Sequence, residues 1–214
     1  MKITKFKSYL KMAQSSVYSE PDTPNFHTPV IIKAINDFIP LMTLTKDGLI
    51  LDIGCGQGAF MNEMRERCYS NVFGVTLSPE DAEACKDKLF SVLNCDFSDI
   101  AYKDKTAQMI WCRHALEHSP YPLFTLFEFN RLLQDDGWLY VEVPAPNLDR
   151  FHENNPNHYS VLGDRMWANL FRTAGFEIAS YQQIGFDITI DDKKMNELFY
   201  CFVLKKNKSL PCIQ

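Results

Sequence analysis

The segment LILDIGCGQG, residues 49–58, constrains this chain more than any other. It is an apolar run that ends at Asp52 and is followed by glycine at every second position, Gly54, Gly56 and Gly58. The apolar run predicts a buried strand, and the glycines allow the backbone to turn sharply and to approach a ligand closely. The next residues begin a helix whose first amide groups point at that ligand. The segment therefore predicts a small-cofactor site at a strand–turn–helix junction.

The spacing of the glycines and the acid before them indicate which cofactor binds. A dinucleotide fingerprint has the spacing G-x-G-x-x-G and places the pyrophosphate at the helix N-terminus. Here the spacing is G-x-G-x-G, and the carboxylate of Asp52 would repel a pyrophosphate. The same carboxylate would attract a compact ligand that carries an ammonium and a sulfonium group, as S-adenosylmethionine does. The alternative interpretation of the glycines is an ordinary tight turn between a strand and a helix.

Composition limits the remaining possibilities. The length of 214 residues fits one domain, or one domain with a small appendage. The net charge of -5, without a large basic cluster, argues against nucleic acid as a substrate. The seven cysteines include no C-x-x-C pair, which is typical of reduced cytoplasmic thiols. The basic start lacks the apolar core of a signal peptide, and no run is long enough to span a bilayer, so we expect a soluble cytoplasmic protein without a membrane partner.

Apolar periodicity predicts alternating strands and helices, and therefore a parallel sheet covered on both faces. The strands are expected at 49–53, 72–75, 91–95, 108–112, 138–143, 177–184 and 198–204, and the helices at 28–39, from 79, 122–133 and 165–173. A polar turn at 191–194 joins the last two strands, which predicts that they are antiparallel. Residues 144–159 contain prolines and asparagines without periodicity, which predicts a long loop.

Helix ends and inward faces are also predicted from single residues. Thr28 is expected to cap the first helix, Ser78 to cap the helix that begins at Pro79, and Gly175 to end the last helix in the left-handed conformation. Four apolar side chains of that last helix are expected to face inward: Met166, Trp167, Leu170 and Phe171.

The chain resembles the class I S-adenosylmethionine-dependent methyltransferases over most of its length. LILDIGCGQG is similar to motif I of that superfamily. Residues 110–144, IWCRHALEHSPYPLFTLFEFNRLLQDDGWLYVEVP, resemble the stretch from strand four to strand five in small-molecule methyltransferases of types 11 and 23. The later HYS and LFRTAGFEI resemble the closing segment of type 23. The resemblance implies a doubly wound, mostly parallel, seven-stranded α/β sheet with an antiparallel last strand, formed by a domain of residues 28–208.

The resemblance also implies which residues bind S-adenosylmethionine. The family places its motif I acid and glycines around the methionine moiety, which here are Asp52, Gly54, Cys55, Gly56 and Gly58. In the family, the chain passes the methionine end and the transferred methyl group just after strand four. Arg113 and His114 occupy that position here.

The nucleoside end of the cofactor departs from the family pattern at one position. The family usually places an acid at the end of strand two to hold the ribose hydroxyls, and this chain has Thr76 there. The piece GVTLSPE resembles the corresponding piece of the cyclopropane fatty acid synthases, which implies that Thr76 and Leu77 lie beside the ribose and the adenine. Asp96 and Phe97 match the family's adenine clamp, although Asp96 could also be an ordinary loop carboxylate.

Catalysis requires less of the protein than binding does, because S-adenosylmethionine is already activated and the enzyme mainly aligns the nucleophile. A hydroxyl acceptor would benefit from a general base, and histidine suits neutral pH. We rank His114 first, followed by His158 and Tyr159 at the end of the long loop. His118 is expected to orient backbone. Helical spacing could bring His114, Glu117 and His118 together as metal ligands. Three neighbouring polar residues at a helix start more often occur by chance, so no metal site is predicted.

The sequence thus predicts a methyltransferase that acts on a small polar molecule, at oxygen and on a sugar or sugar-derived acceptor. One alternative is a methyltransferase or cyclopropane-synthase-like enzyme with a lipid acceptor, and another is a non-catalytic partner subunit that binds S-adenosylmethionine. A third is an NAD-dependent oxidoreductase, and the glycine spacing and Asp52 argue against it. An amino-methylating enzyme of nucleic acids would need paired prolines near residues 119–122, and these are missing. Residues 1–27 are predicted to close over the cofactor as a lid. The sequence makes no prediction about the oligomeric state.

Overall fold

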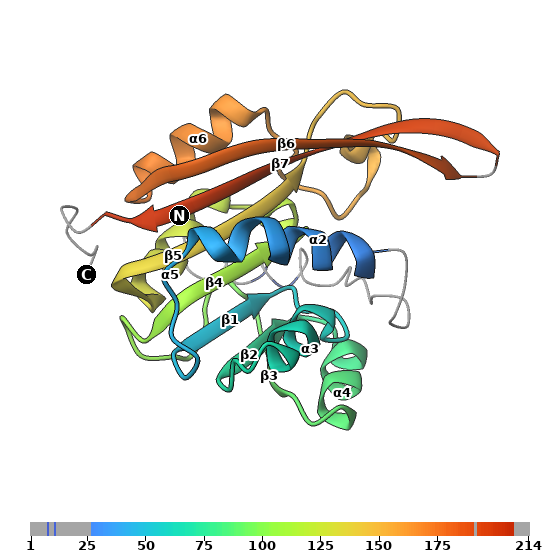
Figure 1. Ribbon diagram of the computed structural model, residues 1–214. Helices are drawn as coiled ribbons and strands as arrows, with labels where there is room; N and C mark the ends of the chain where they lie inside the picture. The colour runs from blue at the N-terminus through green and yellow to red at the C-terminus, as the bar shows by residue number, and fades with distance from the viewer. Residues whose placement is uncertain (1–7, 9–10, 12–26, 191, 208–214) are drawn as a thin grey trace.

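A seven-stranded sheet runs through the centre of the molecule in the order β3-β2-β1-β4-β5-β7-β6 (Figure 1). The computed structural model describes residues 27–190 and 192–207, together with Ser8 and Lys11. The strands are β1 (Leu49–Ile53), β2 (Val72–Thr76), β3 (Ser91–Asn94), β4 (Ala107–Arg113), β5 (Leu133–Pro144), β6 (Phe176–Ile190) and β7 (Lys193–Lys206). Pairing is parallel from β3 through β5, and β7 is antiparallel to both β5 and β6. The predicted doubly wound sheet with a reversed last strand is confirmed.

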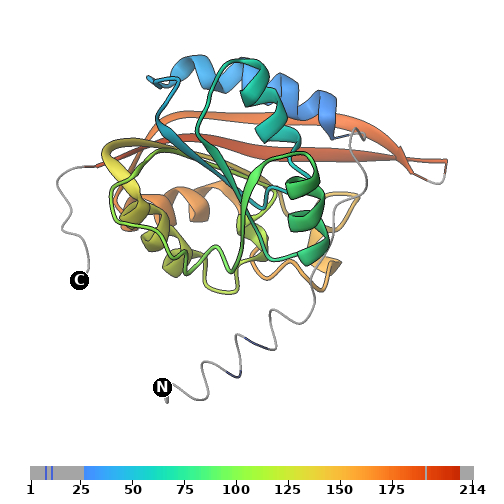
Figure 2. The ribbon, with the colours of Figure 1, turned by 90° about the horizontal axis from the view of Figure 1, so that it is seen from below.

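Helices cover both faces of this sheet. They are α2 (Thr28–Phe38), α3 (Ala59–Glu66), α4 (Pro79–Asp87), α5 (Pro122–Leu132) and α6 (Asp164–Thr173), with single 3-10 turns η1 (Ile39–Leu41), η2 (Leu116–His118) and η3 (His152–Asn154). Figure 2 shows α2 and α3 on one side of the sheet and α5 and α6 on the other. Within the described residues, no helix is both long and apolar enough to cross a membrane.

The apolar core is divided between the two faces because side chains alternate along each strand. In β1, Leu51 and Ile53 pack with the residues of α5 and α6, whereas Ile50 packs with those of α2 and α3. On the α2 side, the ring of Trp111 stacks on Phe60 at 4.5 Å and on Tyr140 at 4.0 Å between ring centroids. Strands buried on both faces explain why β1 has a continuous apolar sequence rather than an alternating one.

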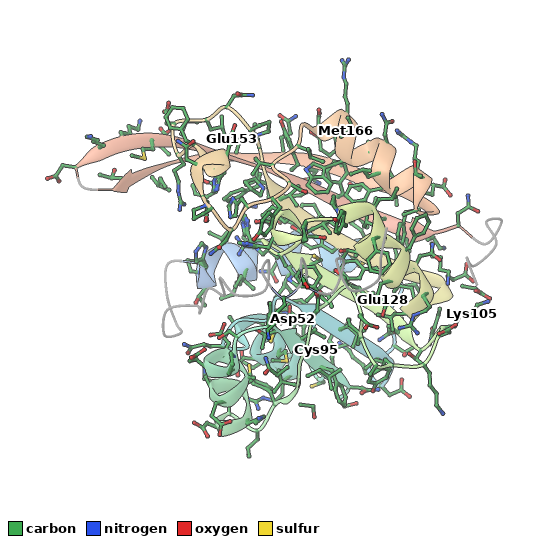
Figure 3. The ribbon with its side chains drawn as sticks, turned by 180° about the vertical axis from the view of Figure 1, so that it is seen from behind. Asp52, Cys95, Lys105, Glu128, Glu153 and Met166 are labelled. Atoms are coloured by element: carbon green, nitrogen blue, oxygen red, sulfur yellow. The ribbon has the colours of Figure 1, made fainter. Side chains whose placement is uncertain are left out.

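Three local predictions about the helices are wrong. Thr28 is the first residue of α2, and the cap position belongs to His27, which makes no side-chain capping bond. Proline is tolerated throughout the first turn of a helix, so Pro29 does not locate the cap to a single residue. The side chain of Met166 is 53% exposed (labelled in Figure 3), because it lies about 100° around α6 from the buried Trp167. Leu133 starts β5 rather than ending α5.

Two other predictions about helix ends are confirmed. The Ser78 hydroxyl accepts a hydrogen bond from the backbone nitrogen of Asp81 at 3.1 Å and so caps α4. Gly175 follows α6 with a φ of 87°, in the left-handed region.

The last two strands form a longer hairpin than the sequence predicts. Apolar patterning stops near residue 184 and resumes near 198, whereas pairing continues to Ile190 and Lys193. The extra pairs are polar at several positions, including an ion pair of 2.6 Å between Asp187 and Lys194, so apolar periodicity misses them. The predicted loop between β5 and α6 contains only the short turn η3. The predicted lid, residues 1–27, lies outside the described residues except for Ser8, Lys11 and His27.

Candidate functional site

A cavity of about 260 Å³ opens where β1 and β4 lead away to opposite halves of the sheet. Doubly wound sheets bind their ligands at this switch point, beyond the carboxyl ends of the strands. The residues that the sequence predicts for the site and that line the cavity are Asp52, Gly54, Cys55, Gly56, Thr76, Leu77, Asp96, Phe97, Arg113, His114 and Tyr159. The fold therefore brings together loops that follow five different strands, and Figure 3 labels Asp52 near the middle of the molecule.

The turn after β1 forms one wall of the cavity. Gly54 has a φ of 67°, and a β-carbon added there would lie 2.7 Å from the β-carbon of Ala115. Its backbone nitrogen donates to the carbonyl of Val75 at 2.8 Å, which ties the turn to the end of β2. The turn after β1 can thus pack directly against the loop after β4 only because this residue has no side chain.

Two predicted residues do not line the cavity. Gly58 occupies the N-cap of α3 with a φ of 86°, and an added β-carbon would meet the ring of Phe90 at 3.0 Å. This glycine therefore serves the conformation and packing of the turn. His158 packs behind the wall, where its ring lies 4.7 Å from that of His118. Burial lowers the pKa of His158 to about 4, so the ring is neutral at pH 7.

The ends of β2 and β3 form a second, polar wall. The hydroxyl oxygen of Thr76 accepts a hydrogen bond from the nitrogen of Ser78 at 3.2 Å, which holds the start of the α4 loop against β2. Asp81 is buried, with 3% of its surface exposed, and lines the same wall. The carboxylate of Asp96 accepts from the nitrogen of Ser98 at 2.8 Å and thereby orders the turn after β3.

A buried charge network lies beneath the loop after β4. One carboxylate oxygen of Glu142 lies 2.9 Å from Nε of Arg113 and 3.0 Å from Nε2 of His114. The other oxygen accepts a hydrogen bond of 2.7 Å from the hydroxyl of Tyr140. Burial alone would raise the pKa of Glu142, but the charge of Arg113 and the hydrogen bond from His114 lower it to about 2. Glu142 is therefore ionised, and it neutralises cationic groups at the floor of the cavity.

The network also occupies both ring nitrogens of His114. Its Nδ1 lies 3.5 Å from Glu117, and its Nε2 faces Glu142. Burial and the charge of Arg113 lower the pKa of His114, but hydrogen bonds with the two carboxylates outweigh them and raise it. The backbone at His114 is left-handed, with a φ of 50°, and its nitrogen donates to the carbonyl of Glu142 at 2.9 Å. This environment favours a positioning role for His114 over the general-base role that the sequence predicts.

The long loop after β5 closes the cavity on the remaining side. The backbone nitrogens of Tyr159 and Ser160 both donate to the carbonyl of Glu117, at 2.9 and 3.0 Å. Nδ1 of His118 lies 2.9 Å from the backbone oxygen of Asn157. The loop is therefore fastened to η2 at its C-terminal half, and it presents Asn157 and Tyr159 to the cavity.

Several residues of the site are absent from the sequence prediction. Glu142 is the one charged residue of the apolar run 138–143, and a charge buried in such a run needs a partner, which is a usable signal. Asp81 lies in the first turn of α4, where an acid is favoured by the helix alone, so its type and position do not indicate a ligand site. His27 lines the cavity with its ring 6.3 Å from that of His114, and burial lowers its pKa to about 4. Nothing in the local sequence places His27 or Asn157 at this site, because their positions depend on the packing of α2 and of the loop.

Comparisons with known proteins match this chain to one family. A family described as a methyltransferase domain matches residues 28–181. The sarcosine/dimethylglycine N-methyltransferase of Halorhodospira halochloris is 25% identical over 161 residues, which cover 65% of this chain and 55% of that protein. The mitochondrial ubiquinone biosynthesis O-methyltransferase of Candida albicans is 32% identical over 105 residues, which cover 44% of this chain and 32% of that protein. The chain thus spans about half or less of the length of these curated relatives.

Solved structures show the same arrangement of elements. A methyltransferase from Archaeoglobus fulgidus, described as dependent on S-adenosylmethionine, matches with a TM-score of 0.67 at 16% identity, over 94% of this chain and 99% of that chain. At this identity the likeness shows the fold.

Proposed function

Because the chain belongs to the methyltransferase-domain family and is an S-adenosylmethionine-dependent methyltransferase, we propose that it methylates an oxygen atom of a small polar molecule, in the class of sugars or sugar-derived hydroxyl compounds. The observation that carries this proposal is the wall formed by η2 and the long loop after β5, where His118, Asn157 and Tyr159 line the cavity. Hydroxyl, amide and imidazole groups in one wall suit an acceptor with several hydroxyls, because each can donate or accept hydrogen bonds.

The residues that line the cavity fit S-adenosylmethionine. Asp52, Gly54 and Gly56 line the cavity where the family holds the methionine moiety, and the buried Asp52 would attract its ammonium and sulfonium groups. Thr76 and Leu77 would contact the ribose and the adenine. The end of β2 lacks the carboxylate that holds the ribose hydroxyls in the family. Asp81, which is buried and lines the cavity, would supply that carboxylate.

The protein's own part in the reaction is orientation. Bound S-adenosylmethionine supplies an activated methyl group, so the alignment of the acceptor oxygen accounts for much of the rate. The pairing of Glu142 with Arg113 and His114 holds the loop after β4 in one position. Tyr159, on the fastened part of the long loop, would bind the acceptor hydroxyl from the other side, and we propose that it directs the attacking oxygen.

Mass spectrometry tests the acceptor class. The protein is incubated with S-adenosylmethionine and, separately, with nucleotide sugars, polyols, phenols, amines and unsaturated phospholipid vesicles. We expect a mass gain of one methyl group on hydroxyl acceptors of the first two groups. Methylation of amines alone, or of lipid alone, would contradict the proposal. A protein that binds S-adenosylmethionine but modifies none of the panel would support the partner-subunit alternative instead.

Calorimetry tests the cofactor site independently of the acceptor. Asp52→Asn should weaken the binding of S-adenosylmethionine by about 10- to 100-fold, because a hydrogen bond to a charged group contributes about 1.5–3 kcal/mol. Asp47→Asn is the matched control, since it removes an exposed carboxylate just before β1 and should leave the affinity unchanged. Equal affinities of the two variants would refute the role of Asp52. Heat from NADH but none from S-adenosylmethionine would refute the cofactor.

A further inference from the structure

The fold brings three metal-binding side chains together at the edge of the cavity. Glu117 and His118 belong to η2, after β4, and His158 belongs to the long loop after β5. One ligand atom from each of the three lies within 4.8 Å of the others. His114 is the third member of the metal-binding group that helical spacing would suggest, but both of its ring nitrogens face carboxylates. The distant His158 completes a set of two imidazoles and one carboxylate.

Two atoms of this cluster are buried without a hydrogen-bond partner. Glu117 is 1% exposed, and its Oε2 has no partner among the described residues. Nδ1 of His158 is likewise buried and unpartnered. Buried polar atoms are nearly always satisfied, and a carboxylate oxygen is costly to leave bare. Both atoms belong to residues of the cluster, so Glu117 and His158 each keep a ligand atom that no hydrogen bond uses within the described residues.

The surroundings of the cluster prepare it for a cation. Nδ1 of His118 lies 2.9 Å from the carbonyl of Asn157, so its proton donates there and Nε2 keeps a free lone pair. Metal-binding histidines are commonly oriented by such a second hydrogen bond. The two backbone bonds from Tyr159 and Ser160 to the carbonyl of Glu117 hold the two ligand-bearing segments together.

We propose that Glu117, His118 and His158 form a binding site for a divalent transition metal ion of the Zn²⁺ class. Two imidazoles and one carboxylate with an open fourth position are the ligands of catalytic zinc sites. Ligand atoms in a tetrahedral zinc site lie ~3.3 Å apart, whereas those of the cluster lie within 4.8 Å of one another. Binding therefore requires side-chain rotations that move the ligand atoms by about an ångström. His118 also lines the cavity, so the open position would bind an oxygen of the acceptor. This last step rests on the proposed function, whereas the metal site itself does not.

Titration of the metal-free protein with Co²⁺ tests the site. We expect one Co²⁺ per chain, with the visible absorption of a low-coordinate ion, and its displacement by Zn²⁺. His158→Gln and His118→Gln should each weaken binding by at least ~100-fold, because the loss of a residue that only orients a metal ligand already costs about 10- to 100-fold. His27→Gln is the matched control, since it removes a cavity-lining histidine outside the cluster and should leave Co²⁺ binding unchanged.

The outcomes separate the metal site from the methyltransferase function. Absence of stoichiometric Co²⁺ or Zn²⁺ binding to the native chain would overturn the proposal, as would equal losses in His27→Gln and His158→Gln. Circular dichroism of each variant shows whether it is folded, and the native titration decides the question even where a variant is not. Calorimetry with S-adenosylmethionine on the metal-free protein measures the cofactor site separately, so that either result can fail alone.

Discussion

The substitution Gly54→Ala tests the claim that the turn after β1 is shaped by a missing side chain. The residue has a φ of 67°, and the new β-carbon would lie 2.7 Å from the β-carbon of Ala115. Two separate costs follow from this geometry. One is the left-handed backbone, which opposes any residue with a β-carbon, and the other is a steric overlap with the loop after β4.

The expected loss of stability combines these costs. An alanine in the left-handed region costs about 1–2 kcal/mol. Overpacking against a well-packed neighbour costs typically about 1–3 kcal/mol. The reduced freedom of the unfolded chain offsets about 0.4–1 kcal/mol. We therefore expect the free energy of unfolding to fall by about 3 kcal/mol, and the affinity for S-adenosylhomocysteine to fall with it, since the overlap moves the wall of the cavity.

Urea unfolding and calorimetry measure the two effects. Gly163→Ala is the matched control, because Gly163 has a φ of -68° and an added β-carbon would find nothing within 4 Å. Its unfolding free energy should fall by no more than about 1 kcal/mol, because Gly163 is the N-cap of α6 and alanine is less favourable than glycine there. The double substitution Gly54→Ala with Ala115→Gly removes the overlap but not the backbone cost, and should recover only part of the loss. Equal stabilities of Gly54→Ala and Gly163→Ala would refute the reasoning.

Two further predictions concern buried polar groups. The folded-state pKa of Glu142 is about 2, below its ordinary value of 4.5, so it stabilises the fold above pH 4.5 and loses that contribution, up to ~3 kcal/mol, as pH falls toward 2. Urea unfolding across this pH range should show a shallower decline of the unfolding free energy for Glu142→Gln than for the native chain. The variant is also less stable at pH 7, because it removes the ion-pair partner of Arg113. An equally steep decline in both proteins would contradict this assignment. Gln108 makes four hydrogen bonds to the turn before β1, so Gln108→Ala should cost about 2–3 kcal/mol in unfolding free energy. Gln134→Ala, which removes a single exposed bond, should cost less than about 0.5 kcal/mol, and similar losses in the two variants would show that the Gln108 bonds contribute little.

The sheet could be predicted from sequence because its signals are local. The continuous apolar run of β1 and the cap at Ser78 act through neighbouring residues, and tertiary packing does not oppose them. The glycine turn is equally local, since its conformation depends on residues that follow one another. The resemblance to the methyltransferase superfamily, rather than local signals alone, is what implied cofactor-side residues at the ends of β1, β2 and β3, and the carboxyl edge of the parallel sheet brings these residues to one cavity.

Prediction failed where apolar periodicity does not record the contacts that decide the structure. The outer half of the β6–β7 hairpin is held by cross-strand pairs such as Asp187 with Lys194, and no apolar alternation announces it. Met166 and Trp167 are both large and apolar, and only the position of α6 on the sheet decides which one is buried. Glu142 gives a signal in its own strand, but the identity of its partners depends on the register of β4 beside β5.

The histidines show most sharply how the fold distributes roles that the sequence leaves equal. His114 and His118 follow the same strand, yet one ring is held between two carboxylates, while the other donates to a backbone carbonyl and lines the cavity. Both arrangements depend on segments that arrive later in the chain, β5 for His114 and the long loop for His118. Because that loop also carries His158 and Tyr159, a change in its sequence would alter the proposed metal site and the acceptor wall together and leave the glycine turn untouched. Acceptor specificity should therefore follow the loop after β5, and cofactor affinity should follow the turns after β1 and β2.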